Sequence, residues 1–165
     1  MVVGKVWYFI GSYHIITSLW ADWSVTMTVK QLSVFVENKP GTMVEIITAL
    51  GDSGIDIRAI SIADTTDFGI LRLIVSDPEK ALEVLRERGC TVTITEVIGV
   101  KLTDRPGGLA HILTFLRDAD ISVEYMYAYV SKSEENACII LRVSDTEKAV
   151  EILETNGVAI VDQAY

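Results

Sequence analysis

Apolar residues along the chain follow two spacings, one typical of strands and the other typical of amphipathic helices. The apolar runs at 32–36 and 98–102 are each followed by apolar residues spaced i, i+3, i+4, i+7. These helical positions are Met43, Ile46, Ile47 and Leu50, and then Leu109, Ile112, Leu113 and Leu116. The pattern predicts a strand, a short loop and the start of a helix at two places in the chain.

Each of the two loops contains a Pro-Gly pair. The loops read Asn38-Lys39-Pro40-Gly41-Thr42 and Asp104-Arg105-Pro106-Gly107-Gly108. Proline and glycine let the backbone turn sharply and leave the first helical N–H groups uncovered. Uncovered N–H groups at the positive end of a helix favour an anion such as a carboxylate, so the loops are candidate binding sites. The alternative is a tight turn with an ordinary cap.

The two loops belong to two copies of one longer unit. Pro106 follows Pro40 by 66 residues, and Ser144 follows Ser76 by 68 residues. The two additional residues fall in a polar turn, at 64–67 in the first copy and 131–136 in the second. Because insertions collect in surface turns, this difference supports the alignment of the copies.

Within each copy the pattern predicts the element order βαββαβ. A hairpin follows the first helix, and a second helix begins where Asp77 precedes Pro78 and ends near Gly89. The fold class is therefore α+β, with two ferredoxin-like repeats whose antiparallel sheets carry helices on one face. We expect an N-terminal extension at 1–29, repeat 1 at 30–97 and repeat 2 at 98–165. Residues 91–102 form one extended run, so we expect the repeats to be packed together.

The N-terminal residues do not fit this pattern. All three tryptophans lie within the first 26 residues, and His14 is the only titratable side chain between Lys5 and Asp22 that can carry a positive charge. A signal peptide would end in a small-x-small cleavage site, and a membrane span needs about twenty consecutive apolar residues. Neither feature is clear, so we expect residues 1–29 to be an extension outside the fold.

A strand, an Asn/Asp-x-Pro-Gly loop and an amphipathic helix within a βαββαβ unit resemble the ACT domain. Two such units in series resemble the small free-standing tandem ACT proteins, and the resemblance covers residues 30–161. Domains of this kind bind an amino acid or a related small effector, often at an interface between two domains. The resemblance therefore implies a regulatory sensor without catalytic activity.

The resemblance places ligand-binding residues in both loops and at the start of the second strand of each repeat. They are Asn38, Pro40, Gly41, Thr42, Asp56, Ile57, Asp104, Arg105, Pro106, Gly107, Gly108, Ser122 and Val123. Helix N–H groups would take the ligand carboxylate, and Asn38 or Asp104 would accept from its ammonium group. The strand-start residues of a neighbouring domain would close the pocket. Because one loop has the neutral Asn38 and Thr42 where the other has the acidic Asp104 and Gly108, we expect the two loops to bind unequally, up to loss of binding at one of them.

Three tyrosines alternate along a predicted strand and share one face of the sheet. They are Tyr125, Tyr127 and Tyr129, and the aligned residues of the first copy are Ala59, Ser61 and Ala63. Aromatic residues on such a face stack bases in RNA-recognition modules, but a chain with 14 basic and 23 acidic residues and a net charge of −9 lacks the required basic surface. We therefore expect the bulky and small faces to interlock, within the chain or across a dimer.

The remaining side chains predict no catalytic residue, cofactor or metal. Cys90 and Cys138 lie far apart without ligand spacing, so we interpret them as buried thiols in a reducing cytoplasm. His111 has no Ser, Cys or carboxylate partner set by spacing, and we interpret it as solvated or capping. No Gly-rich phosphate loop is present.

Together these patterns suggest a cytoplasmic, non-catalytic homodimer that binds an amino acid and regulates metabolism, with no role for nucleic acid or a membrane. Such a sensor needs a ligand that favours one state over another. The alternative is a regulatory subunit that contacts a separate metabolic enzyme and whose ligand sites are degenerate.

Overall fold

The computed structural model describes residues 27–64, 68–103, 105–129 and 136–161. In chain order the elements are β1 (Val29–Glu37), α1 (Thr42–Asp52), β2 (Ile57–Asp64), β3 (Phe68–Val75), α2 (Pro78–Glu87), β4 (Thr91–Thr103), α3 (Gly108–Asp118), β5 (Val123–Tyr129), β6 (Asn136–Val143), α4 (Thr146–Thr155) and β7 (Ala159–Val161). Most of the expected N-terminal extension, together with Asp104, lies outside the described residues. No helix in the described part is long and apolar enough to cross a membrane.

The helices α2 and α4 begin as their sequences predict. The side chain of Asp77 accepts a hydrogen bond from the backbone N–H of Lys80 at 3.0 Å, and Asp145 accepts from Lys148 at the same distance. Such caps satisfy one of the N–H groups that a helix start leaves without an intrahelical partner. The aspartate caps thus fix where the second helix of each repeat begins.

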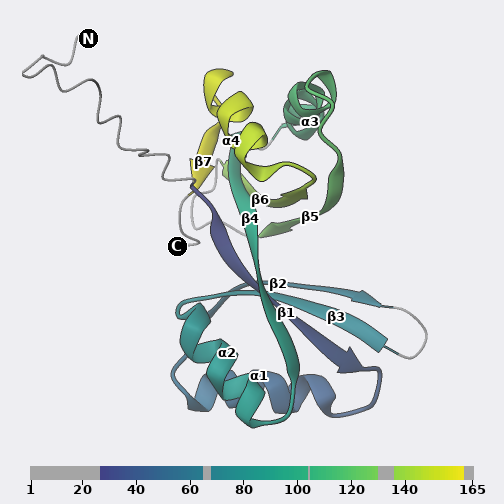
Figure 1. Cartoon of the computed structure of the whole chain (residues 1–165), viewed down its shortest axis with the longest axis vertical. Helices are drawn as coiled ribbons and strands as arrows, with labels where there is room; N and C mark the ends of the chain where they lie inside the picture. Colours follow the sequence, from purple (N-terminus) through teal and green to yellow (C-terminus); the bar gives the residue numbers. More distant parts are fainter. Residues whose placement is uncertain (1–26, 65–67, 104, 130–135, 162–165) are drawn as a thin grey trace, which may run out of the picture.

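The strands form one seven-stranded antiparallel sheet in the order β2-β3-β1-β4-β6-β5, with β7 added to β4 (Figure 1). Strand β4 pairs with β1 up to Val97, opposite Val29, and with β6 from Ile98, opposite Leu141. The last strand of the first unit and the first strand of the second are therefore one continuous strand. The α+β class with ferredoxin-like units is confirmed. Two βαββαβ units would have eight strands, and the sheet has seven because the units share β4.

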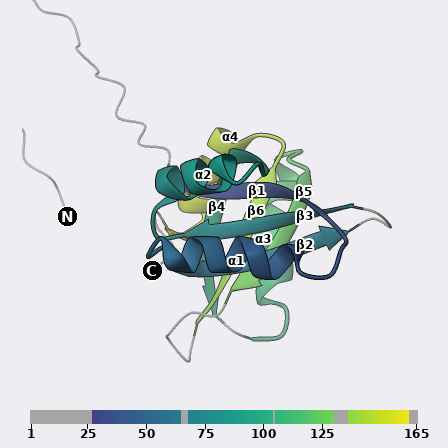
Figure 2. The same cartoon turned by 90° about the horizontal axis from the view of Figure 1, so that it is seen from below.

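Each unit has its own hydrophobic core between its strands and its two helices. We call residues 30–97 repeat 1 and residues 98–165 repeat 2, a division that stays a prediction. The fully buried large residues of repeat 1 include Leu32, Leu50, Leu71, Leu73 and Leu85, and those of repeat 2 include Ile98, Leu116, Leu141 and Leu153. Helices α1 and α2 lie at one end of the molecule and α3 and α4 at the other (Figure 1). In the view from below, α1 and α2 lie in front of the strands (Figure 2).

A third apolar cluster joins the two repeats where their helix-free sheet faces meet. Its buried members are Val29, Ala59, Ile74, Val97 and Ile140, with Tyr125 and Tyr127 packed against them. Small residues of β2 and large residues of β5 thus interlock within one chain. Of the two arrangements that the sequence left open for these faces, the structure shows the intramolecular one.

Gln31 adds a polar link to this contact. Its side chain is fully buried, and its Nε2 donates to the hydroxyl of Tyr125 at 2.9 Å and to Ser33 Oγ at 3.0 Å. The Tyr127 hydroxyl donates to Gln31 Oε1 at 2.9 Å, and the Arg72 guanidinium lies 3.9 Å from the centre of the Tyr125 ring. Because a buried amide is costly unless it is hydrogen-bonded, this network holds the repeats in one register.

Candidate functional site

The helices that follow the Pro-Gly loops begin without a side-chain cap. Gly41 and Gly107 occupy the N-cap positions of α1 and α3 with φ angles of 96° and 86°, and glycine has no side chain that could cap the helix start. A positive φ of this size favours glycine, which has no Cβ to clash with the backbone. The contrast with the aspartate-capped α2 and α4 recurs in both repeats, as the sequence predicts.

The N–H groups of these helix starts are partly satisfied by the loops themselves. In α1, Thr42 donates to the Lys39 carbonyl at 3.3 Å and Glu45 donates to Gly41 at 3.0 Å. In α3, Gly108 donates to Arg105 at 3.0 Å and His111 donates to Gly107 at 3.1 Å. The two N–H groups between them, those of residues 43–44 and 109–110, have no acceptor among the described residues. Each helix start can therefore donate two hydrogen bonds to a ligand.

The loop side chains of repeat 1 lie at the surface. Asn38 is exposed, and its Oδ1 lies 3.4 Å from the point where a Cβ at Gly69 would stand. Lys39 forms an ion pair with Glu37, Pro40 is exposed, and Thr42 is half-buried as the first residue of α1. The Asn38 amide therefore lies beside the β2–β3 hairpin as well as beside the helix start.

The strand-start residues are held by the same backbone contacts in both repeats. The N–H of Asp56 donates to Ser76 Oγ at 3.0 Å, and the N–H of Ser122 donates to Ser144 Oγ at 3.1 Å. The Asp56 carboxylate lies 3.3 Å from the Arg58 guanidinium, and the Ser122 side chain is exposed. The neighbouring Ile57 and Val123 are half-buried in the edges of their own cores.

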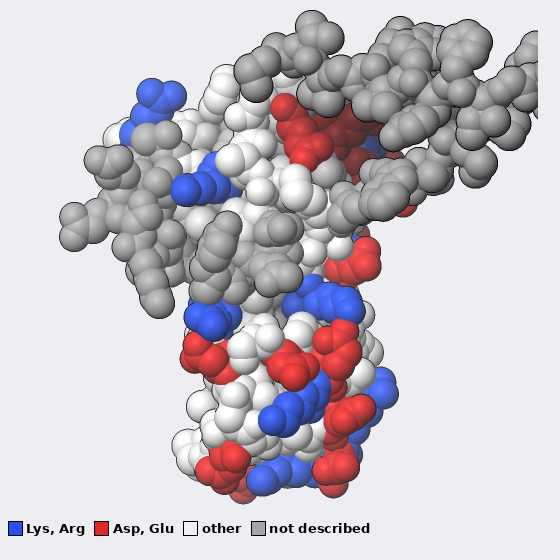
Figure 3. Space-filling view, turned by 90° about the vertical axis from the view of Figure 1, so that its left-hand side faces the viewer, with Lys and Arg blue, Asp and Glu red and all other residues white. Residues whose placement is uncertain are grey.

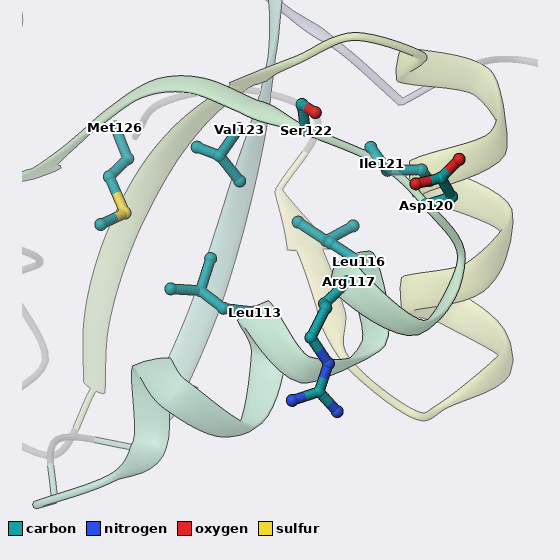
Figure 4. Close-up of a pocket in the computed structure, with 8 residues that line it drawn as sticks. All are labelled: Leu113, Leu116, Arg117, Asp120, Ile121, Ser122, Val123 and Met126. Carbon is teal, nitrogen blue, oxygen red and sulfur yellow. The ribbon is translucent and has the colours of Figure 1, made fainter.

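Ser122 and Val123 line a cavity of about 340 Å³ between α3 and β5, the α3–β5 cavity (Figure 4). Leu113 from α3 and Val123 from β5 point toward one another across it, whereas the Arg117 guanidinium points away from Val123. That guanidinium donates instead to the carboxylate of Asp118, with its Nη2 at 2.7 Å. The walls that face each other in this cavity are therefore mainly apolar.

Arg105 and Gly108 line a second cavity of about 350 Å³, the loop cavity, at the start of α3. Its other lining residues are Lys101, Leu102, His111, Ile112, Phe115, Asn156, Gly157, Val158 and Ala159. The structure thus places the loop residues and the strand-start residues of repeat 2 in separate cavities. Neither cavity includes a residue of repeat 1.

Lys101 and His111 are residues that the loop motif did not single out as ligand-binding. Both are exposed, and the imidazole of His111 contacts the ring of Phe115 with 4.7 Å between ring centres. Lys101 lies on the strand before the loop, and His111 lies in the first turn of the helix after it. A comparison of the charges at aligned positions of the two copies was the signal that could have found them.

The two cysteines lie apart in the part of the chain that the structure describes. Cys90 and Cys138 are free thiols, Cys138 is buried, and burial raises the pKa of Cys90. Among the described residues, no three His, Cys, Asp or Glu side chains lie close enough to hold a metal.

On the face shown in Figure 3, acidic and basic side chains alternate over repeat 1.

The fold and the paired loops define a tandem ACT protein, and comparison of the sequence with known families agrees. The chain belongs to the ACT domain pair family, whose sequence model matches residues 27–164. This confirms the resemblance that the Pro-Gly motifs carry.

Solved structures show the same doubled fold. Protein BT0572 from Bacteroides thetaiotaomicron is 39% identical, with a TM-score of 0.78 over 82% of this chain and 92% of that one. The ligand-free regulatory subunit of aspartate kinase from Thermus thermophilus is 18% identical, with a TM-score of 0.57 over 76% of this chain and 91% of that one. The corresponding subunit from Thermus flavus is 17% identical, with a TM-score of 0.55 over 76% and 90%. The likeness of this chain to the two kinase subunits is a likeness of fold. Comparison with curated proteins gives no match.

Proposed function

We propose that this protein is a non-catalytic sensor that binds an amino acid at its Pro-Gly loops and regulates metabolism through the resulting change of shape or association. The observation that carries the proposal is the contrast between the two kinds of helix start. Aspartates cap α2 and α4, whereas α1 and α3 each keep two N–H groups without an acceptor in the described part of the chain. Two free N–H groups at a helix start suit a carboxylate, which amino acids carry.

Membership of the ACT domain pair family supports a regulatory role. In the proposal, the bare helix starts bind the ligand carboxylate, while Asn38 in one loop and Asp104 in the other accept from its ammonium group. An amino acid carries both charges at neutral pH, so a site of this kind needs both a donor and an acceptor.

The second half of each site would come from a second copy of the chain. Within one chain, the two cavities keep Arg105 and Gly108 apart from Ser122 and Val123. A neighbouring copy that places its strand starts, around Asp56 or Ser122, against a loop would close the pocket. The homodimer is thus part of the same proposal.

A thermal-shift screen of the twenty amino acids tests this function. We expect one or a few of them to raise the melting temperature in a concentration-dependent way, because a ligand that binds only the folded state stabilises it. Asn38→Ala and Asp104→Ala should each weaken binding at one loop, whereas Asp118→Ala, at the far end of α3, should leave binding unchanged.

Failure of all twenty amino acids would overturn the sensor proposal. If a fixed enzyme partner then co-purifies in stoichiometric amount and its kinetics change in the complex, the alternative of a regulatory subunit with degenerate sites holds. Exposed apolar side chains on the edge strands, with Ile60 and Ile62 on β2 each about half exposed, favour some form of association.

A further inference from the structure

The loop cavity of repeat 2 gathers three cationic or protonatable side chains from different elements. Lys101 comes from β4, Arg105 from the loop and His111 from the first turn of α3. Leu102, Ile112 and Phe115 provide the apolar part of the wall, and the turn at 156–159 closes the opposite side. At about 350 Å³, the cavity is within the usual range for small-molecule sites.

These three side chains are not neutralised within the described part of the chain. The ion pairs found there join other residues: Lys30 to Glu79, Lys39 to Glu37, Arg58 to Asp56, Arg117 to Asp118 and Arg142 to Glu124. The side chain of His111 contacts the ring of Phe115, and its backbone N–H belongs to the helix start. In a protein of net charge −9, three such unpaired groups around one cavity mark a local site for negative charge.

Repeat 1 carries a different set of charges at the aligned positions. At the 66-residue spacing, Lys101, Arg105 and His111 correspond to Phe35, Lys39 and Glu45. Lys39 is paired with Glu37, and the Glu45 carboxylate helps to raise the pKa of the nearby Cys90, after the larger effect of burial. Where repeat 2 is cationic, repeat 1 therefore has an aromatic ring, a neutralised lysine and a carboxylate.

We propose that the loop cavity of repeat 2 takes a small dianion, a molecule with two carboxylates or an equivalent pair of negative groups, while repeat 1 does not share this preference. The inference rests on the proposed function, since it names the class of ligand for one of its two loops. The uncapped helix start cannot explain a preference of repeat 2 alone, because both repeats have an uncapped helix start. Lys101 and Arg105 carry it, because they supply the positive charge that a second carboxylate needs, and the imidazole of His111 adds a hydrogen-bond donor beside them.

The chain would then respond to two chemically different ligands through one shared strand. One anionic group of the ligand would lie against the start of α3, and the second would lie among Lys101, Arg105 and His111. Phe115 and Leu102 would contact the methylene groups between them. An acidic amino acid and a dicarboxylate without an amino group both meet this description, and they differ only in their need for an ammonium acceptor.

Calorimetric titration of the full chain with L-glutamate, L-glutamine and 2-oxoglutarate tests the inference. Glutamate and glutamine have nearly the same shape and differ in the charge of the side chain, so their ratio isolates the second carboxylate. We expect glutamate and 2-oxoglutarate, which each carry two carboxylates, to bind at least about tenfold more tightly than glutamine, because only they can place a second carboxylate among the cationic side chains. Raising the salt concentration should weaken the binding of glutamate and 2-oxoglutarate more than the binding of glutamine.

The triple variant Lys101→Gln, Arg105→Gln, His111→Gln should abolish this preference, and Arg105→Lys should keep most of it. Lys39→Gln, the aligned substitution in repeat 1, is the matched control and should leave the preference unchanged. All of these side chains are exposed, and circular dichroism with the melting temperature verifies that each variant folds.

The outcomes separate this inference from the proposed function. If glutamine binds as tightly as glutamate and the triple variant weakens both equally, both occupy repeat 2, so the dianion inference is wrong and the sensor proposal stands. If 2-oxoglutarate binds to the wild type but not to the triple variant, and no amino acid binds, the dianion site stands and the amino acid proposal is wrong. A dianion that binds equally to the triple variant overturns the assignment of the site. Absence of binding by these three compounds and by all twenty amino acids overturns both proposals.

Discussion

Two glycines, one just before α1 and one within it, show how a single residue sets the geometry of the loop. Gly41 precedes α1 with a φ angle of 96°, and Gly51 lies near the end of α1 without a positive φ. A Cβ built at either position meets no other atom within 4 Å. Any difference between alanine substitutions at these two positions must therefore come from the backbone, because packing is the same open space in both.

We predict that Gly41→Ala lowers the free energy of unfolding by about 1–2 kcal/mol, the cost of a left-handed conformation for a residue with a Cβ. Gly51→Ala should raise it by about 0.5–1 kcal/mol, because alanine loses less backbone entropy in a helix. Urea denaturation followed by circular dichroism measures both. Changes of the same sign in the two variants would contradict the backbone argument.

At the scale of the elements, strands β1 and β5 are joined by a buried polar network that belongs to neither repeat alone. Gln31 of β1 exchanges hydrogen bonds with Tyr125 and Tyr127 of β5. Burial raises the pKa of the Tyr127 hydroxyl, with the neighbouring Tyr125 adding to the effect. The neutral phenol is thus part of what holds the sheet faces of the two repeats together.

We predict that Tyr127→Phe lowers the free energy of unfolding by about 1–3 kcal/mol at neutral pH, because Gln31 Oε1 loses a buried donor. The wild-type protein should also lose stability as the pH rises above 10.0, the ordinary pKa of a tyrosine, since the folded state keeps a proton that the unfolded chain releases. Urea denaturation between pH 7 and about pH 11 measures both effects.

The variant itself provides the control for the pH effect. Without the Tyr127 hydroxyl, the decline in stability above pH 10.0 should be shallower than in the wild type. Equal declines in the two proteins would show that other groups cause it, even if the loss at neutral pH is observed.

At the scale of the whole molecule, the sheet ends in two edge strands that are copies of one another. β2 pairs only with β3 and β5 only with β6 in the described part of the chain. Ile60 and Ile62 on β2 are 50% and 49% exposed, and Met126, aligned with Ile60, is 43% exposed. Edge strands with exposed apolar side chains tend to pair with another chain.

We predict that the protein is a homodimer and that Ile60→Lys and Met126→Lys, separately or together, shift it toward the monomer. Lysine on an edge strand opposes strand pairing by charge and by the cost of desolvation. Sedimentation equilibrium measures the change, and Glu83→Lys, at an exposed position in the middle of α2, is the control that should remain dimeric. A wild-type protein that stays monomeric at high concentration would contradict the prediction.

The sequence by itself determined the elements whose signals are local. The aspartate caps of α2 and α4, the glycine corners before α1 and α3, and the two hairpins depend on residues a few positions apart, so each could be predicted without knowing what packs against it. The repeat followed from the same signals, because two loops of one kind recurred in one order.

The tertiary structure decided everything that depends on partners distant in the sequence. It merged two expected strands into β4, and it placed Ala59 against the tyrosines of the same chain. It also placed Arg105 and Ser122 of the same repeat in separate cavities, and it placed Lys101 and His111 beside the loop. Local propensity determines where a helix begins, but the free energy that selects one docking of two sheet faces comes from surface buried between residues far apart in the chain.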